Sequence, residues 1–339
     1  MNMSNGSSGV NGSTSSPPIP VPSPPPIHIQ WLVIGIITGI TNASLLLFII
    51  FNRKLHSITN FILCSKLVIG FCFGIIYVIP RQAIPFISSV AILCDFIPQL
   101  GTGLMINLNL HVCLISFHRY FLIINPFRYK ERATSRNVVI VLTSTWLLSI
   151  FIAAIPLFTF RPIHGIQCIT LGDINAETVY LSSVFIILFL VPLVVLVATY
   201  GKILVIVLTL HKNHVYPAGD KSANISIKTN RKALIQAAVM IGIFFCLFVP
   251  FVVGVIIFFF ALRAGKVGPL VPVLTATQYP AFCYPALSPI LNILFMSDIR
   301  VEVVNFVRAS YSNISGDNNS YTYESSQAQR RRKTLTSNF

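Results

Sequence analysis

Residues 115–120 read Ile-Ser-Phe-His-Arg-Tyr, and they close an apolar run that begins near residue 91. This run decides the fold, because it is long enough to cross a lipid bilayer and ends on an arginine, Arg119. A charged side chain at the end of a lipid-buried helix is costly unless it faces a bundle interior or water, so Arg119 is expected to be functional. The stretch Asn-Pro-Phe-Arg-Tyr follows at 125–129.

Six further apolar runs accompany this one along the chain. Only 10% of the residues are charged and mean hydropathy is +0.77, whereas a soluble domain has about 25% charged residues. The runs far exceed the ~9–11 residues of a barrel strand, so each is expected to be a helix. The sequence therefore predicts an all-α membrane protein, a seven-transmembrane helix bundle with spans near 29–52, 59–80, 91–124, 136–159, 178–210, 232–262 and 270–296.

The net charge of +15 is distributed unevenly about these spans. With the N-terminus outside, only Arg81, Arg161, Arg263 and Lys266 belong to the outer face, so most basic residues are cytoplasmic, as the positive-inside rule requires. The charge is thus a topology signal, and no nucleic-acid partner is expected. Lys66 falls inside the second span, where we expect it to extend its ammonium toward the cytoplasmic interface.

The chain divides into four parts. Residues 1–28 are Asn/Ser-rich and then Pro-rich, which predicts a disordered extracellular tail, with glycosylation sequons at Asn2, Asn5 and Asn11. No cleavable leader is expected before the membrane domain, 29–296. Residues 297–309 are predicted to form an amphipathic membrane-surface helix, and 310–339 a disordered cytoplasmic tail. Cys94 and Cys168 both fall at the oxidising outer face, which favours a disulfide between them.

The pattern resembles the rhodopsin-like (class A) G-protein-coupled receptors over about 29–309. The resemblance rests on landmarks in the expected order in all seven spans, together with the cysteine pair: Asn42, Thr59-Asn60-Phe61, Arg119, Trp146, Pro156, Pro192, Tyr200, Phe244, Pro250 and Pro289. It implies a plasma-membrane receptor that passes a ligand signal to a heterotrimeric G protein. Arrestin and receptor kinases are further expected partners, acting through the tail, while no cofactor and no catalytic residue are expected.

The resemblance also implies roles for single residues. Arg119 becomes the switch residue that meets the G protein, and Phe127 inserts into it from the loop. The other switch positions are His118, Tyr120, Pro126, Tyr200 and Asn292. Connector and hinge positions are Asn109, Pro192, Phe244, Phe248, Pro250 and Pro289, since prolines remove backbone hydrogen bonds and kink helices. Intramembrane Asn42 is expected to tie spans together.

Several positions depart from the family pattern. His118 and Asn230 replace acids that commonly restrain the arginine, so we hypothesise a loosened inactive state with raised basal signalling. Gly70 replaces the aspartate of span two, so a sodium pocket is expected to be absent. Asn292 replaces the tyrosine of the span-seven motif, which puts its contact to Tyr200 in doubt.

Carrying over the family's pocket positions predicts a binding cavity with few polar groups. Gly101 replaces the aspartate that pairs with an amine ligand, and Phe282 replaces the lysine that binds retinal, so both ligand classes are disfavoured. An uncharged, largely apolar small molecule fits such a site. The predicted lining is Gly101, Thr102, Met105, Val184, Phe185, Leu188, Phe251, Val252, Val255, Gln278, Tyr279 and Phe282.

Alternatives remain open at this point. A peptide ligand would contact the outer loops, where Asp95, Asp173 and Glu177 are available. A receptor-like protein that does not couple is favoured by the departures at the switch. A transporter or channel would need paired intramembrane charges or repeated halves, which the sequence lacks. An enzyme is disfavoured because the few carboxylates are scattered in loops and no metal or nucleophile motif occurs.

Overall fold

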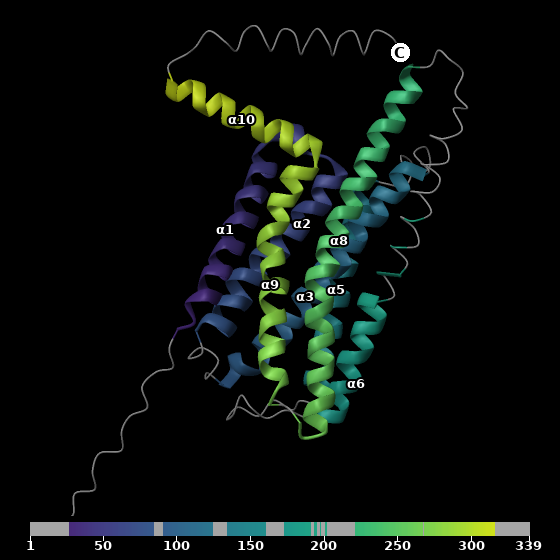
Figure 1. The fold of residues 1–339 in the computed structure, drawn as a ribbon. Coiled ribbons are helices and arrows are strands. Elements are labelled where there is room, and N and C mark those ends of the chain that lie inside the picture. Colours follow the sequence, from purple (N-terminus) through teal and green to yellow (C-terminus); the bar gives the residue numbers. More distant parts are fainter. Residues whose placement is uncertain are drawn as a thin grey trace, which may run out of the picture.

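The computed structural model describes residues 27–84, 91–124, 134–160, 173–190, 193–194, 197, 201, 221–266 and 268–315. These residues form a bundle of long, roughly parallel helices (Figure 1), and no strand occurs within them. The spanning elements are α1 (Ile29–Phe51), α2 (Ile58–Cys72) with the π-helical η2 (Phe73–Ala83), α3 (Ala91–Ile124), α5 (Ser135–Thr159), α6 (Ile174–Phe185) with η4 (Ile186–Leu190), α8 (Lys221–Arg263) and α9 (Leu270–Phe295). The predicted all-helical bundle is confirmed.

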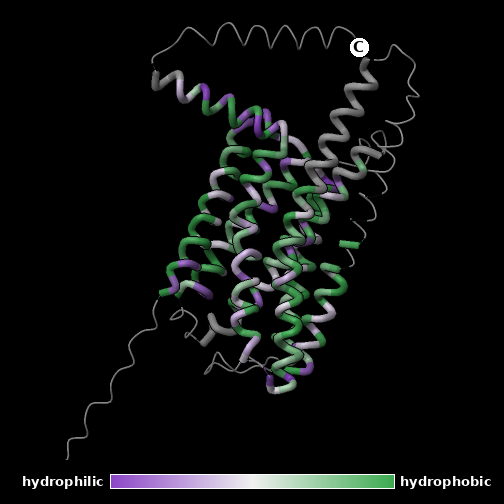
Figure 2. The backbone as a smooth tube through the Cα atoms, viewed as in Figure 1, coloured by the Kyte–Doolittle hydropathy of each residue, from purple (hydrophilic) through white to green (hydrophobic). Residues whose placement is uncertain are grey.

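Hydropathy follows the bundle axis. Apolar residues run the length of the helices, and polar residues concentrate at the ends and along α10 (Ser297–Ser315; Figure 2). Within the described residues, five helical stretches are long and apolar enough to cross a membrane. The other two predicted spans correspond to α6 and α9. The chain after α6 is only partly described. The 26 residues of α9 make about 39 Å of helix.

Three helix ends differ from the predicted spans. α8 begins at Lys221, inside the predicted loop 211–231, because hydropathy marks the edge of the bilayer and no glycine or proline stops the helix there. α6 begins at Ile174, because the Asp173 carboxylate accepts a hydrogen bond from the backbone N–H of Asn175 at 2.9 Å and caps the helix. α10 continues to Ser315, beyond the predicted end at 309.

Prolines in two helices free carbonyl oxygens that neighbouring helices then satisfy. Pro289 has no N–H, so the carbonyl of Pro285 loses its helical donor, and Asn42 Nδ2 of α1 donates to that oxygen at 2.9 Å. Likewise Pro156 leaves Ile152 without a donor, and Tyr180 Oη of α6 donates to it at 2.9 Å. These bonds join α1 to α9 and α6 to α5. The expectation that Asn42 ties spans together is confirmed.

A polar chain joins α2, α3 and α5 at mid-bundle. Trp146 Nε1 donates to Ser65 Oγ at 3.0 Å, and Ser65 Oγ lies 2.9 Å from His111 Nε2. His111 Nδ1 lies 2.9 Å from the carbonyl oxygen of Asn107. A neutral imidazole with its proton on Nδ1 satisfies each of these contacts. The spans are therefore held in register by a few directed bonds between apolar surfaces.

The helix α10 crosses the end of the bundle opposite the start of α1 (Figure 1). Its Ile299 is fully buried against a core of α1 and α2 residues, and Arg300 donates to the carbonyl oxygen of Leu294, which caps the end of α9. Lys54 and Glu302 form an ion pair of 3.5 Å. Its outer side exposes Val304, Val307 and Tyr311, so a membrane-surface position remains our prediction.

Candidate ligand cavity and switch region

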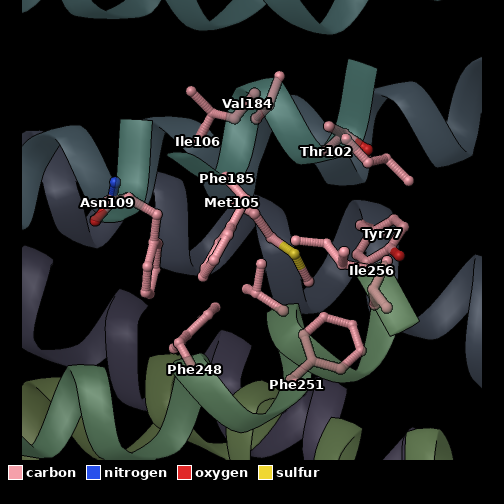
Figure 3. A pocket seen from close by; sticks show the side chains of 14 residues that line it. Tyr77, Thr102, Met105, Ile106, Asn109, Val184, Phe185, Phe248, Phe251 and Ile256 are labelled. Carbon is pink, nitrogen blue, oxygen red and sulfur yellow. The ribbon is translucent and has the colours of Figure 1, made fainter. Parts of the chain in front are cut away.

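A cavity of about 200 Å³ opens between η2, α3, α6 and α8 (Figure 3). α3 contributes residues at helical spacing, Thr102, Met105 and Asn109, and α8 faces them with Phe248, Phe251 and Val252. The remaining lining residues are Tyr77, Ile106, Leu181, Val184, Phe185, Phe189, Val255 and Ile256. The cavity thus lies between helices on which the family resemblance predicted pocket residues.

Seven of the predicted pocket residues line this cavity together: Thr102, Met105, Val184, Phe185, Phe251, Val252 and Val255. Gly101, Gln278, Tyr279 and Phe282 do not line it. The side chain of Leu188 lies outside the described residues. The predicted connector residues Asn109 and Phe248 do line it, so the cavity extends down to the connector.

Tyr77 is the reason that Gly101 is not in the wall. Its ring lies directly over Gly101, where any Cβ atom would overlap the ring carbons. Sequence reasoning missed Tyr77 because η2 is π-helical, and its wider turn changes which side chains face inward. A lone tyrosine opposite a glycine is a weak signal without the structure. The space that an aspartate would occupy at position 101 is taken by an aromatic ring.

Two of the predicted pocket residues on α9, Tyr279 and Phe282, belong to an aromatic cluster and do not line the cavity. Tyr279 stacks on Trp31 of α1 with ring centroids 4.4 Å apart, and Phe282 meets Trp31, Phe73 and Phe251 edge to face at 5.1–5.6 Å. Phe282 is only 1% exposed. These rings bind α9 to α1 and η2, so they form a wall behind the cavity, where aromatic pairs add to packing.

The polar groups of the cavity are few and uncharged. No acidic or basic side chain occurs among the described lining residues. The Thr102 hydroxyl donates to the carbonyl oxygen of Pro98 at 3.0 Å, which leaves its lone pairs to accept. Tyr77 and Asn109 supply the other hydrogen-bonding groups. A charged ligand group would find no counter-charge here and would lose its hydration.

The aromatic wall of the cavity continues along α8, from Phe248, which lines the cavity, to Phe244, the next predicted connector residue. Phe244 is fully buried and its ring centroid lies 4.7 Å from that of Phe248 and 4.9 Å from that of Tyr284 on α9. Pro250 lies one turn beyond Cys246 in α8 and has no N–H, so the carbonyl of Cys246 loses its helical donor. The contacts of Phe248 with Phe244 and of Phe244 with Tyr284 join the wall of the cavity to the middle of α9. They lie beside Pro250, where α8 can bend.

Lys66 corrects one expectation from the sequence. It does not reach the interface: the residue is 3% exposed, its Nζ donates to Tyr284 Oη at 3.3 Å, and it lies 5.4 Å from the centroid of that ring. Lys66 shares the inward face of α2 with buried Leu63, Leu67 and Gly70, so its stem points into the bundle. Among the described residues, no carboxylate pairs with it.

The departure at Gly70 also has a structural counterpart. A Cβ atom at Gly70 would overlap the side-chain amide of Asn42, which fills the space beside the glycine. The amide is held there by its bonds to the carbonyl oxygens of Thr38 and Pro285, at 2.8 and 2.9 Å. The glycine is therefore needed for the α1–α9 bond.

Of the switch residues, the structure describes two side chains. His118 is 8% exposed in α3, and Asn292 is 1% exposed near the end of α9, where its Nδ2 has no hydrogen-bond partner among the described residues. Arg119 and Tyr120 continue α3, with side chains outside the described residues. Also outside lie Pro126, Phe127, Pro192, Tyr200, Cys168, the sequons at Asn2, Asn5 and Asn11, and the side chains of Cys94 and Asn230.

Comparison with known proteins gives receptors of one family. The D(5)-like dopamine receptor of Takifugu rubripes is 29% identical over 231 residues, which are 60% of this chain and 49% of that receptor. The 5-hydroxytryptamine receptor 1F of Rattus norvegicus is 28% identical over 176 residues, 50% of this chain and 47% of that receptor. The D(1B) dopamine receptor of Homo sapiens is 26% identical over 294 residues, 71% and 60% of the two chains. This chain spans about half the length of the first two relatives.

The family model described as 7 transmembrane receptor (rhodopsin family) matches residues 41–292, which are most of the chain and run from the middle of α1 to near the end of α9. The helical bundle, its apolar spans and the similarity to dopamine and serotonin receptors agree with this match. The expected class of signalling receptor, as a multi-pass protein of the plasma membrane, is confirmed. The chain belongs to the rhodopsin family of seven-transmembrane receptors.

Proposed function

We propose that this chain is a receptor for an uncharged, largely apolar small molecule, which it binds between α3, α6 and α8 and converts into activation of a heterotrimeric G protein. The observation that carries the proposal is the absence of any charged side chain among the described cavity-lining residues, together with the ring of Tyr77 over Gly101. Apolar and aromatic walls with a few hydrogen-bonding groups are typical of sites for neutral ligands.

A route from the cavity to the G-protein side runs along α3 and α8. Asn109 lines the inner end of the cavity, and Arg119 stands ten positions further along the same helix, about 15 Å away. On α8, Phe248 and Phe251 face the ligand space on either side of Pro250. A ligand that displaces these rings would change the packing of Phe244 on Tyr284. Both helices therefore connect the cavity to the switch end.

The test uses the full-length receptor in cells with a G-protein dissociation readout. Arg119→Ala, which removes the proposed coupling residue, defines the signal without coupling. A library of neutral apolar compounds and a matched library of amines, dopamine and serotonin included, are then screened. We expect agonists only among the neutral compounds. Agonism by an amine in the wild-type receptor would overturn the ligand class, and a signal that persists in Arg119→Ala would overturn the coupling mechanism.

Filling the cavity is expected to abolish agonism by such compounds. In Val252→Phe the added ring occupies much of the roughly 200 Å³ available, so we expect potency to fall at least ~100-fold, equivalent to about 2.7 kcal/mol. Val253→Phe adds the same ring to the neighbouring residue, which is exposed on the outside of α8 and does not line the cavity. Dose-response curves on both variants, at matched surface expression, check this. Equal potency on the two variants would place the ligand elsewhere.

Restoring an acid beside Arg119 is expected to lower basal signalling. His118 is nearly buried, so a carboxylate in its place would attract the neighbouring guanidinium in a low-dielectric setting and restrain it. We expect His118→Asp to reduce ligand-free G-protein activation several-fold. His118→Asn, which has nearly the same size and no charge, serves as the control. Unchanged basal activity in His118→Asp, or the same reduction in His118→Asn, would contradict a missing charge restraint.

A further inference from the structure

A second hollow lies on the membrane-facing side of the bundle, between η2, α3 and α5. Its volume is about 640 Å³, within the range of about 300–1,000 Å³ that is usual for ligand sites. Its rim consists of side chains that are exposed on the bundle surface, among them Ile76, Phe96, Leu100, Ile150 and Phe158. Since this surface lies within the membrane-spanning part of three helices, the hollow opens to lipid.

Small residues form part of the floor of this groove. Gly103 of α3 faces Ala153 of α5, and a Cβ atom on the glycine would lie only 3.1 Å from that of the alanine. Ala154 and Ser149 line the same region. Helices that meet at small residues approach closely, and the buried apolar side chains of Ile97 and Leu104 line the groove beside them. Such a surface accepts a flat, rigid apolar body.

Asn107 stands at the inner end of the groove. It follows Phe96, Leu100 and Gly103 at helical spacing on the same face of α3, and all four line the groove. Asn107 is 1% exposed, and neither its Oδ1 nor its Nδ2 has a hydrogen-bond partner among the described residues. The other polar groups nearby are satisfied, since Trp146 Nε1 donates to Ser65 and Ser149 Oγ donates to the Trp146 carbonyl oxygen. A buried amide without partners costs about 1–3 kcal/mol.

The depth of Asn107 narrows the class of occupant. α3 begins at the outer face, and from Phe96 at the outer mouth to Asn107 the helix rises about 16 Å. An ordinary outer-leaflet lipid has its polar group at the membrane surface and only hydrocarbon at this depth. A fitting molecule is therefore apolar and rigid, with one polar end at the surface and a hydrogen-bonding group at its buried end. No charged side chain lines the described groove, so that group is neutral.

We propose that this groove is a site for a sterol hydroxylated at the end of its side chain, whose terminal hydroxyl pairs with the Asn107 amide. The ring system lies on the small residues Gly103, Ala153 and Ala154, and the aromatic rings of Phe96 and Phe158 border the outer mouth. The terminal hydroxyl both donates and accepts, so it satisfies Oδ1 or Nδ2 of Asn107. The site is separate from the cavity between α3, α6 and α8, with which it shares no lining residue.

The experiment uses the purified full-length receptor in phosphatidylcholine nanodiscs and two photoreactive probes. One probe is a diazirine analogue of 25-hydroxycholesterol, and the other is the same analogue of cholesterol, which lacks the side-chain hydroxyl. Labelled residues are mapped by mass spectrometry, with unlabelled 25-hydroxycholesterol as competitor. We expect the hydroxylated probe to label α3 and α5 at the groove, with at least ~10-fold tighter half-saturation than the cholesterol probe, the equivalent of about 1.4 kcal/mol.

Three variants distinguish a hydrogen bond to Asn107 from nonspecific contact of the probe with the receptor surface. Asn107→Leu is expected to bring the hydroxylated probe down to the affinity of the cholesterol probe. Ala154→Phe, which fills the groove without touching the amide, is expected to abolish labelling by both, and it keeps the test valid if Asn107→Leu fails to fold. Leu147→Phe adds the same bulk to an exposed position of α5 outside the groove and should change nothing. Equal labelling by the two probes, labelling that Ala154→Phe leaves intact, or no labelling at the groove would each overturn the proposal.

Discussion

Replacing Asn42 with leucine is expected to destabilise the folded bundle by about 1–3 kcal/mol, because the carbonyl oxygen of Pro285 is then buried without a donor. Leucine has the same branching and the same number of side-chain heavy atoms as asparagine, so it still fills the space beside Gly70. The loss therefore reports the hydrogen bonds and not a cavity. Thermal unfolding of the purified receptor in one detergent, followed by size-exclusion chromatography after heating, measures the change.

A second substitution tests whether Pro289 is the reason that the carbonyl oxygen of Pro285 needs Asn42 as its donor. Pro289→Ala supplies the missing backbone N–H four residues after Pro285, so α9 can satisfy its own carbonyl group. We expect Asn42→Leu to lower the stability of the folded receptor much less in the Pro289→Ala background than in the wild type. Pro280→Ala is the control, since it also removes a proline from α9 but supplies its N–H to a different carbonyl. Equal costs of Asn42→Leu in all three backgrounds would show that Asn42 does not compensate for Pro289.

These contacts show where sequence reasoning succeeds. Seven spans are predictable because crossing a bilayer depends on local composition and length alone. A lone asparagine in an apolar run predicts a polar tie for the same reason, since it has to find a partner. Its actual partner, Pro285, follows only from knowing that α1 packs on α9. Helix ends beyond the bilayer, such as Lys221, are missed because hydropathy changes at the membrane surface and the helix does not.

The cavity was partly predictable for a related physical reason. Lining residues on α3 and α8 follow from regular helical spacing once the register is known. Tyr77 could not be assigned this way, because the π-helical turns of η2 shift the register of every residue beyond Cys72. Tyr279 and Phe282 were misplaced because their rings pack on Trp31, a long-range pairing that no local pattern encodes.

Lys66 was misplaced because the sequence gives its depth and not the direction in which it points. Only the packing of α2 shows that its face is turned inward, toward Tyr284. The consequence is a buried amine whose hydrogen-bonding partner among the described residues is one hydroxyl group. Leaving such a group without its acceptor is costly, whereas replacing a buried polar pair with apolar side chains is often neutral or stabilising.

Tyr284→Phe is therefore expected to destabilise the receptor by about 1–3 kcal/mol, because it leaves the Lys66 amine without its acceptor. Lys66→Leu is expected to be neutral or stabilising, because it removes a buried polar group. Phenylalanine keeps the ring against Phe244 and Phe248, so the change isolates the hydroxyl. Leucine at position 66 joins the apolar Leu63 and Leu67 on the same buried face. The same heating assay measures each variant at constant pH.

The double variant decides between a polar and a packing role for Tyr284. If the hydroxyl matters because it accepts from Lys66, then Tyr284→Phe should lower stability much less once Lys66 is leucine, and the coupling free energy between the two changes should be about 1–2 kcal/mol. Equal costs with and without Lys66 would mean that the hydroxyl serves another group. Because Tyr284 contacts the rings of α8, basal G-protein activation in the same variants shows whether the Lys66–Tyr284 hydrogen bond also holds α8 against α9.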